Sequence, residues 1–198
     1  MKNRKLFLSL LLLAVIYISF IALGLPDALL GSAWNLVRDD LNVSLGSLGL
    51  MTIVIYIMSI ISTYNAPRLL RLFQTKWITF VSITFTGLAL IFLSQVNAFY
   101  QMLFFAIPLG IGAGAIDVSL NHYLAKNYKA SHMNYLHSFY GIGVTLGPSI
   151  MAATLKNESW RNGYIIVGSI LLFIALLVLL SLKLWRKETP EEKVHHEH

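Results

Sequence analysis

The stretch that decides the fold is Leu109 to Pro148, which reads LGIGAGAIDVSLNHYLAKNYKASHMNYLHSFYGIGVTLGP. Its first part is apolar, rich in glycine and long enough to cross a membrane, yet it contains one acid, Asp117, with Asn121 one helical turn further on. An ionisable group in hydrocarbon costs several kcal/mol unless it faces a partner or a watery cavity. Asp117 is therefore the first candidate for a functional site.

The composition excludes an ordinary soluble domain. Hydrophobic residues make up 57% of the 198 residues and charged residues only 12%, whereas about a quarter of the residues of a soluble domain are charged. The net charge of +6 comes from basic residues in short loops, which fits membrane orientation better than a nucleic-acid partner. The absence of cysteine excludes disulfides and thiolate metal sites. We expect an all-α membrane protein without a cofactor.

Apolar runs of about 20 residues, the length that crosses a bilayer, recur along almost the whole chain. We expect a six-helix transmembrane domain over 1–185 and a disordered cytoplasmic tail over 186–198. Pro26 is expected to kink the first helix, and 67–76 is expected to be a loop. The predicted helices are 6–37, 45–66, 77–96, 99–128, 134–155 and 163–185.

Basic residues are distributed unequally between the two sides that this arrangement defines. With both termini in the cytoplasm, only Arg38, Lys156 and Arg161 of the 15 basic residues lie outside. Cytoplasmic loops of membrane proteins carry an excess of lysine and arginine. The sequence therefore predicts a multi-pass protein of the cell inner membrane with both ends cytoplasmic.

Two acids lie at membrane depth, Asp27 in the first helix and Asp117 in the fourth. These helices begin two triplets, and the last helix of each triplet is the most lipid-like, which is the pattern of an inverted three-plus-three repeat. At about 1.5 Å per residue, Asp117 lies roughly 13 Å from the cytoplasmic end at Lys126. Asn121 and His137 are expected at a similar depth to each other, with Asp117 one turn deeper. Carboxylates at different heights along one cavity suit a proton relay, because burial favours the neutral acid.

Each candidate has a plainer interpretation. A buried aspartate also serves as neutral, hydrogen-bonded packing glue, and His137 near a helix start is also compatible with a solvated or packing role. Trp34 and Tyr140 could stack on a sugar ring or anchor the helices at the interface. The three histidines of the tail lack the fixed geometry that a metal site needs. A helix-packing role is expected for the glycines Gly110, Gly112 and Gly114.

Three segments together resemble a known family. They are GxGAGAIDVSLNHYLA from Gly110, MNYLHSFYGIGVTLGP from Met133 and GLPDALLGSAWNLV from Gly24. They are similar to helices 4, 5 and 1 of the major facilitator superfamily, in particular its fucose:proton symporter-like branch. The resemblance implies a secondary transporter that works by alternating access, driven by protons. By position, Asp27 and Asp117 match the family's acids for sugar contact and proton coupling, and Asn121, His137 and Tyr140 fall where it places polar substrate contacts. Trp34 and Asn35, in the polar second half of the first helix, are further candidate contacts. The candidate packing or gating positions are Arg68, Arg71, Gly143, Gly147 and Pro148.

The chain departs from the family in two ways. LLRLFQTKW from Leu69 has Arg71 where the family's gating loop carries an acid, and Gln74 where it carries a glycine. Members of the superfamily also have two six-helix halves, and this chain has one. Two parallel copies could bury the acid-bearing face around an axis along the membrane normal. We therefore expect a parallel homodimer or a separate second half, with a truncated product as the alternative.

Three functions remain open on the sequence. The first is a proton-coupled carrier for a small neutral solute such as a sugar, because the candidate residues offer carboxylate, amide, imidazole and phenol groups. The second is a regulatory membrane scaffold without transport, which the altered loop favours. The third is an intramembrane aspartyl protease, which needs two carboxylates that share a proton at one depth, whereas Asp27 and Asp117 are expected at different depths.

Overall fold

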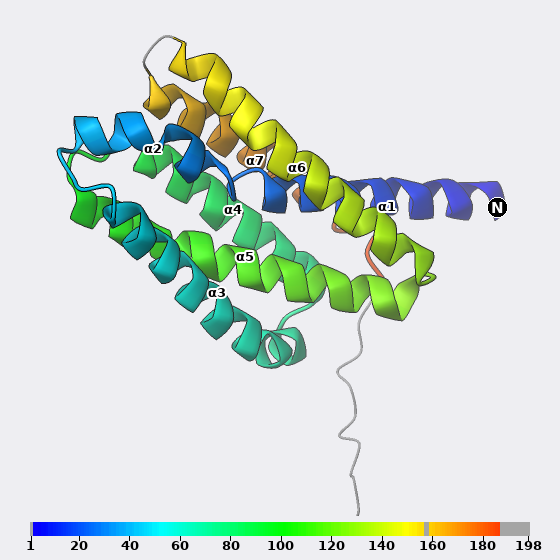
Figure 1. Ribbon diagram of the computed structural model, residues 1–198. Coiled ribbons are helices and arrows are strands. Elements are labelled where there is room, and N and C mark those ends of the chain that lie inside the picture. Colours follow the sequence, from blue (N-terminus) through cyan, green and yellow to red (C-terminus); the bar gives the residue numbers. More distant parts are fainter. Residues whose placement is uncertain (1, 157–158, 187–198) are drawn as a thin grey trace, which may run out of the picture.

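The computed structural model describes residues 2–156 and 159–186 (Figure 1). Six of its segments are long and apolar enough to cross a membrane, which confirms the predicted number of spans. The tail was predicted over 186–198, and all of it except Arg186 lies outside the described residues, as do the tail histidines. The helices are α1 (Lys2–Gly24), α2 (Leu29–Asp40), α3 (Ser47–Leu72), α4 (Thr75–Leu93), α5 (Phe99–Asn127), α6 (Ser131–Leu155) and α7 (Trp160–Ser181).

The first span is broken rather than kinked. Because Pro26 has no N–H group, the helix loses a backbone hydrogen bond at this point. The chain continues through tight turns, in which the N–H of Asp27 donates to the carbonyl of Gly24 at 3.3 Å and that of Leu29 to Pro26 at 3.1 Å. The two parts of the span, α1 and α2, therefore meet at Asp27, in the middle of the membrane-crossing segment.

The prediction of a loop over 67–76 is wrong. Helix α3 continues through Pro67 to Leu72, and the only non-helical residues before α4 are Phe73 and Gln74. A proline inside a helix removes one hydrogen bond, but the leucines and arginines that follow it are good helix formers. Arg68 and Arg71 are therefore exposed helix residues at the end of α3.

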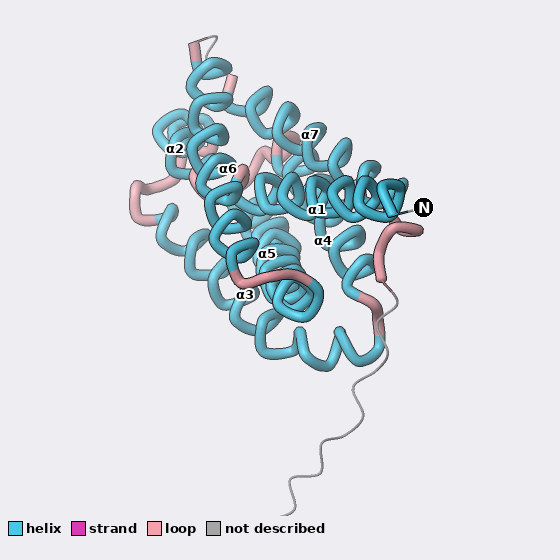
Figure 2. Tube along the Cα trace, turned by 90° about the vertical axis from the view of Figure 1, so that its right-hand side faces the viewer, coloured by secondary structure: helices cyan, strands magenta, loops and turns pink. Residues whose placement is uncertain are grey.

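The helix packing follows the expected three-plus-three repeat. Helix α3 packs most extensively on α5, and α6, its counterpart in the second triplet, packs on α1. The last members of the two triplets, α4 and α7, pack on each other. Figures 1 and 2 place α3 and α7 on opposite sides of the bundle. This exchange of partners is what a twofold relation between the triplets requires.

Glycines of α5 allow its close contacts with α3 and α4. A Cβ atom at Gly110 or Gly114 of α5 would collide with carbonyl oxygens of α3, those of Ile55 and Ser59. Gly112 faces the other way, against Thr86 of α4. Small residues spaced four apart let transmembrane helices approach backbone to backbone. The α3–α5 pair is further joined by the Ser62 hydroxyl, which donates to the carbonyl of Ile111 at 2.7 Å.

One arginine holds together three helix ends at one end of the bundle. Its Nη1 atom donates to the carbonyls of Ser94 at 2.9 Å and Val96 at 2.7 Å, which follow α4, and its Nη2 atom to Asp40 of α2 at 2.8 Å. This residue, Arg161, belongs to the first turn of α7, and its guanidinium lies 4.4 Å from the ring centroid of Trp160. Carbonyls at a helix end have no partner within the helix, so Arg161 caps α4 while it pairs with Asp40.

Candidate functional site

The break between α1 and α2 presents Asp27 to the neighbouring helix α6. The Tyr140 hydroxyl donates a hydrogen bond to Oδ2 of Asp27. The contact is possible because the backbones of α1 and α6 almost touch: a Cβ atom at Gly143 would collide with the carbonyl oxygen of Ile21, and one at Gly24 with that of Tyr140. The glycines of α1 and α6 therefore position the Asp27–Tyr140 pair.

Asp117 lies on α5 and is held by its own helix. The Asn121 side chain donates from Nδ2 to Oδ1 of Asp117 at 2.9 Å, and from the same atom to the Asp117 backbone carbonyl at 2.9 Å. This amide fixes the orientation of the carboxylate and leaves its second oxygen, Oδ2, for another group. Within residues 2–156 and 159–186, the buried Oδ1 of Asn121 has no hydrogen-bond partner.

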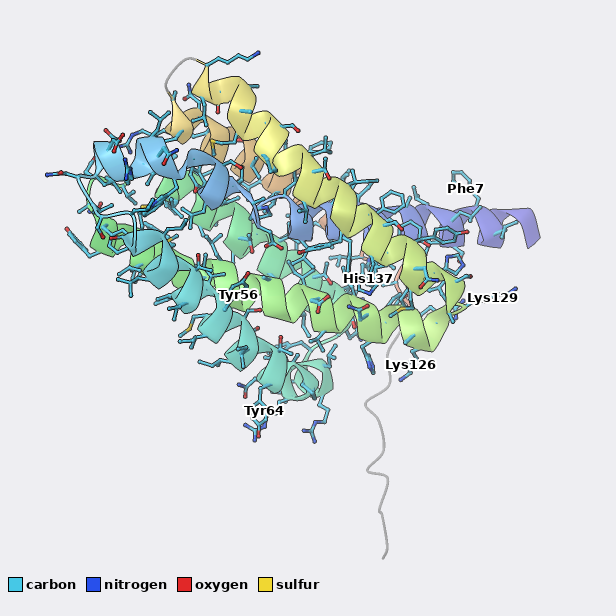
Figure 3. All side chains as sticks on the ribbon, in the orientation of Figure 1. Phe7, Tyr56, Tyr64, Lys126, Lys129 and His137 are labelled. Carbon is cyan, nitrogen blue, oxygen red and sulfur yellow. The ribbon has the colours of Figure 1, made fainter. Side chains whose placement is uncertain are left out.

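Both aspartates open into a cavity of about 310 Å³. Figure 3 shows His137 on α6 and Tyr56 on α3, from two of the helices that contribute to its walls. The His137 ring also packs edge-on against Phe20, with 6.0 Å between the ring centroids. The polar residues lining this cavity are Asp27, Tyr56, Ser59, Thr63, Asp117, His137 and Tyr140.

A second cavity of about 610 Å³ begins at the same place. Asp27, Tyr56 and Tyr140 line both cavities, so this group stands where the two meet. From there the larger cavity extends between α2, α3, α4, α5 and α7. None of the described residues that line either cavity is a lysine or an arginine, so Asp27 and Asp117 have no permanently charged cation beside them in these walls.

Not every expected site residue takes part. Trp34 is only 2% exposed and packs against Phe99, with 6.4 Å between the ring centroids, so it lines neither cavity. Asn35 is exposed on α2 and also lies outside both cavities. Asn121 reaches the site only through Asp117.

The remaining packing positions also stay away from the cavities. Gly147 packs on the carbonyl of Leu25, and Pro148 lies inside α6. Arg68 and Arg71 lie at the end of α3 and line neither cavity.

Sequence reasoning missed two cavity-lining tyrosines, Tyr56 and Tyr164. Tyrosine in a membrane helix is ordinary at the interface and carries no signal of its own. Tyr56 could have been found from its place on α3 only once α3 was known to face α5. Within residues 2–156 and 159–186, no group of three His, Asp or Glu side chains has a metal-binding arrangement.

The chain is similar to two transport proteins of Bacillus subtilis (strain 168). The glucose/mannose transporter GlcP of Bacillus subtilis (strain 168) is 25% identical over 167 residues, which cover 81% of this chain and 39% of that protein. The bacillibactin exporter of the same organism is 30% identical over 117 residues, or 54% of this chain and 28% of the exporter. The chain thus spans well under half the length of these two relatives.

The family itself is decided by a match along almost the whole chain. The family model described as the Major Facilitator Superfamily matches residues 2–197. The members of this family are transporters and not enzymes. The six apolar helices form two triplets that pack on each other, which is consistent with one half of the family's fold. The chain belongs to the Major Facilitator Superfamily.

Proposed function

We propose that this chain forms half of a proton-coupled carrier for a small neutral hydroxylated solute such as a sugar, which works by alternating access. The observation that supports it best is the wall shared by the two cavities, where Asp27 and Tyr140 lie, with Asp117 and His137 in the adjoining space. A similarity to the fucose:proton symporter-like branch is part of this proposal, and the relative named as a glucose/mannose transporter agrees with a sugar.

The two aspartates would have different roles. Asp27 accepts a hydrogen bond from the Tyr140 hydroxyl, and a solute hydroxyl could take the place of that donor. Carboxylates accept hydrogen bonds from hydroxyl groups and, when ionised, bind them more strongly than a neutral acceptor does. Asp117 has one oxygen held by Asn121 and shares its cavity with His137, an arrangement that suits the loading and release of a proton.

The proposal includes a second half. In the most apolar stretches of α3 and α6 only 17% of the residues are buried, against 44% to 50% for the other four spans. These two helices flank the cavities, and exposed apolar residues such as Ile57, Ile60 and Ile142 extend their outer faces. We infer that a second copy in parallel orientation, or a separate second half, covers them. We further propose that the chain lies in the cell inner membrane with both termini in the cytoplasm.

The oligomeric state has a direct measurement. We expect the purified chain to have a detergent-corrected mass of two copies, and a cysteine placed at Ile60 to crosslink to its equivalent in the partner. Phe85 of α4, which is similarly exposed at 58%, gives the matched control, because α4 packs on α5 and α7 at the other side of the bundle. A monomeric mass combined with transport would contradict the homodimer, and crosslinks from Phe85 alone would contradict the placement.

Transport itself is tested by solute counterflow. Proteoliposomes that contain the full chain and are preloaded with unlabelled D-glucose or D-mannose should take up the labelled sugar faster than protein-free liposomes. Asp27→Ala should reduce this exchange by at least about tenfold, because it removes a charged hydrogen-bond acceptor from the site. Exchange at the rate of protein-free liposomes for both sugars would contradict a sugar carrier.

A further inference from the structure

Two helix crossings beside the cavities are built in the same way. In the first, α1 passes α6 where a Cβ atom added at Gly143 would lie 3.1 Å from the Cα atom of Gly24. In the second, α5 passes α3 where a Cβ atom added at Gly114 would collide with the carbonyl oxygen of Ser59. In the three-plus-three repeat, α1 is the counterpart of α5, and α6 is the counterpart of α3. The second crossing is therefore the repeat equivalent of the first.

Each crossing carries an aspartate and a tyrosine at matching positions. Along the chain, the aspartate comes three residues after the contact glycine of α1 or α5, and the tyrosine comes three residues before the contact residue of α6 or α3. These residues are Asp27 and Tyr140 at the first crossing, and Asp117 and Tyr56 at the second. Tyr56 is thus the repeat equivalent of Tyr140, and Asp117 that of Asp27.

Of these two pairs, only the first is hydrogen-bonded in the described part of the chain. The Tyr140 hydroxyl donates to Asp27, whereas Asp117 accepts its side-chain bond at Oδ1 from Asn121. The difference has a local reason: α5 continues as a regular helix past Asp117 and brings Asn121 within reach one turn later, but α1 ends before Asp27. Tyr56 nevertheless lines the same cavity as Asp117, and the Tyr140 hydroxyl is close enough to both to interact with them electrostatically.

The ionised form of Asp117 needs more hydrogen-bond donors than the neutral form. In a site of low dielectric constant, the charged carboxylate is stabilised by every hydrogen bond that it accepts, whereas the neutral acid has an O–H group that can itself donate. Asn121 supplies one donor to Oδ1, so Oδ2 requires a second. Helix α4 contributes no side chain to this cavity, and the titratable groups that face Asp117 there come from the α1–α2 break, α3 and α6: Asp27, Tyr56, His137 and Tyr140.

We propose that Tyr56 is a positioning residue for the proton at Asp117: its hydroxyl donates to Oδ2 when Asp117 is ionised, and that bond breaks when Asp117 takes up a proton. Each aspartate of the half is then served by a tyrosine from the helix that crosses beside it. The role of Asp117 as the proton carrier rests on the proposed function. The equivalence of the two crossings rests on the structure and the sequence alone.

The pairing is tested by infrared spectroscopy of the full chain in lipid, as the difference between spectra recorded at low and high pH. Ionisation of Asp117 should remove a carboxyl C=O band, which is identified by its loss in Asp117→Asn. A tyrosine C–O band should change in the same difference spectrum, and this change should be lost in both Tyr56→Phe and Asp117→Asn. Tyr64→Phe is the matched control, because Tyr64 is 77% exposed on the same helix and lines neither cavity. It should keep both bands.

Transport gives a second measurement on the same variants. In Tyr56→Phe the ratio of proton-driven glucose accumulation to glucose counterflow should fall about tenfold, because the ionised carboxylate loses a hydrogen bond. Tyr64→Phe should keep the wild-type ratio. Phenylalanine retains the ring of Tyr56, and thermal unfolding in detergent checks that the variant is folded.

Each outcome decides between explanations. A wild-type spectrum without a tyrosine change would overturn the proposal, because another group, such as His137 or Thr63, would then supply the second bond. A tyrosine change that persists in Tyr56→Phe and is lost in Tyr140→Phe would overturn it too, because Tyr140 would then be the donor. Glucose exchange combined with a spectrum that Tyr56→Phe leaves unchanged refutes this inference and leaves the carrier in place. A tyrosine change that needs both Tyr56 and Asp117, without glucose exchange, supports the pairing and refutes the sugar carrier.

Discussion

Gly143→Ala is expected to reduce the free energy of unfolding by about 3 kcal/mol. The added Cβ atom would collide with the carbonyl oxygen of Ile21 and lie 3.1 Å from the Cα atom of Gly24. Both are backbone atoms of α1, so no side-chain rotation can relieve the contact, and α1 must move away from α6. That movement would also separate Asp27 from Tyr140. The measurement is the apparent melting temperature of the detergent-solubilised chain, followed by size-exclusion fluorescence.

Gly141→Ala is the matched control on the same helix. Gly141 is exposed, and no atom lies within 4 Å of a Cβ atom added there. Alanine is favoured over glycine in a helix by about 1 kcal/mol, so this variant should be as stable as the wild type or more stable. An equal loss at both positions would show that the helix, and not the contact with α1, is sensitive to substitution.

Asp117→Asn is expected to abolish sugar accumulation driven by a proton gradient while counterflow continues. Asparagine has nearly the same shape, but it cannot carry a proton on and off. Its side-chain oxygen can still accept the bond from Asn121 Nδ2, so the local geometry should be retained. Accumulation in proteoliposomes with an imposed pH gradient should fall at least about tenfold, because the variant lacks the carboxyl group that is proposed to load and release the proton.

The control for the loss of charge is Asp39→Asn. Asp39 is exposed near the end of α2, where its carboxylate pairs only with the adjacent Arg38 at 3.1 Å among the described residues. This variant should keep both accumulation and exchange. If Asp117→Asn accumulated sugar as well as Asp39→Asn does, Asp117 would not be the coupling residue. If it lost counterflow too, Asp117 would be needed for solute binding instead.

The sequence predicts best those features whose free-energy cost in lipid is high. The number of spans follows from hydropathy, and the positions of Asp27 and Asp117 at membrane depth follow from counting residues. The structure places both of them on one cavity. The repeat was predicted from the pattern of acids and apolar helices, and the exchange of packing partners agrees with it. These features depend on the chain's local composition, which can be read without knowing the neighbours.

The predictions of the loop after Pro67 and of some site residues are wrong, because helix propensity and tertiary contacts determine the structure at those positions. Pro67 predicts the start of a loop, but the helix formers beyond it extend α3 to Leu72. Trp34 is a candidate sugar contact in the sequence, yet it points into the core against Phe99. It shares the apolar face of α2 with Leu30 and Val37, so the helical spacing of apolar residues does predict its burial. Tyr164 was overlooked because it sits in the almost purely apolar sixth span, where only its missing hydrogen bond marks it out.

Arg161 has a mechanical consequence for any movement of this half. It links the ends of the first and third spans, through Asp40, Ser94 and Val96, to the start of the sixth. The first and third spans belong to one triplet and the sixth to the other, so at this rim the two triplets cannot slide past each other without breaking charge-assisted bonds. A switch between inward and outward access would therefore tilt the six spans together as one rigid body.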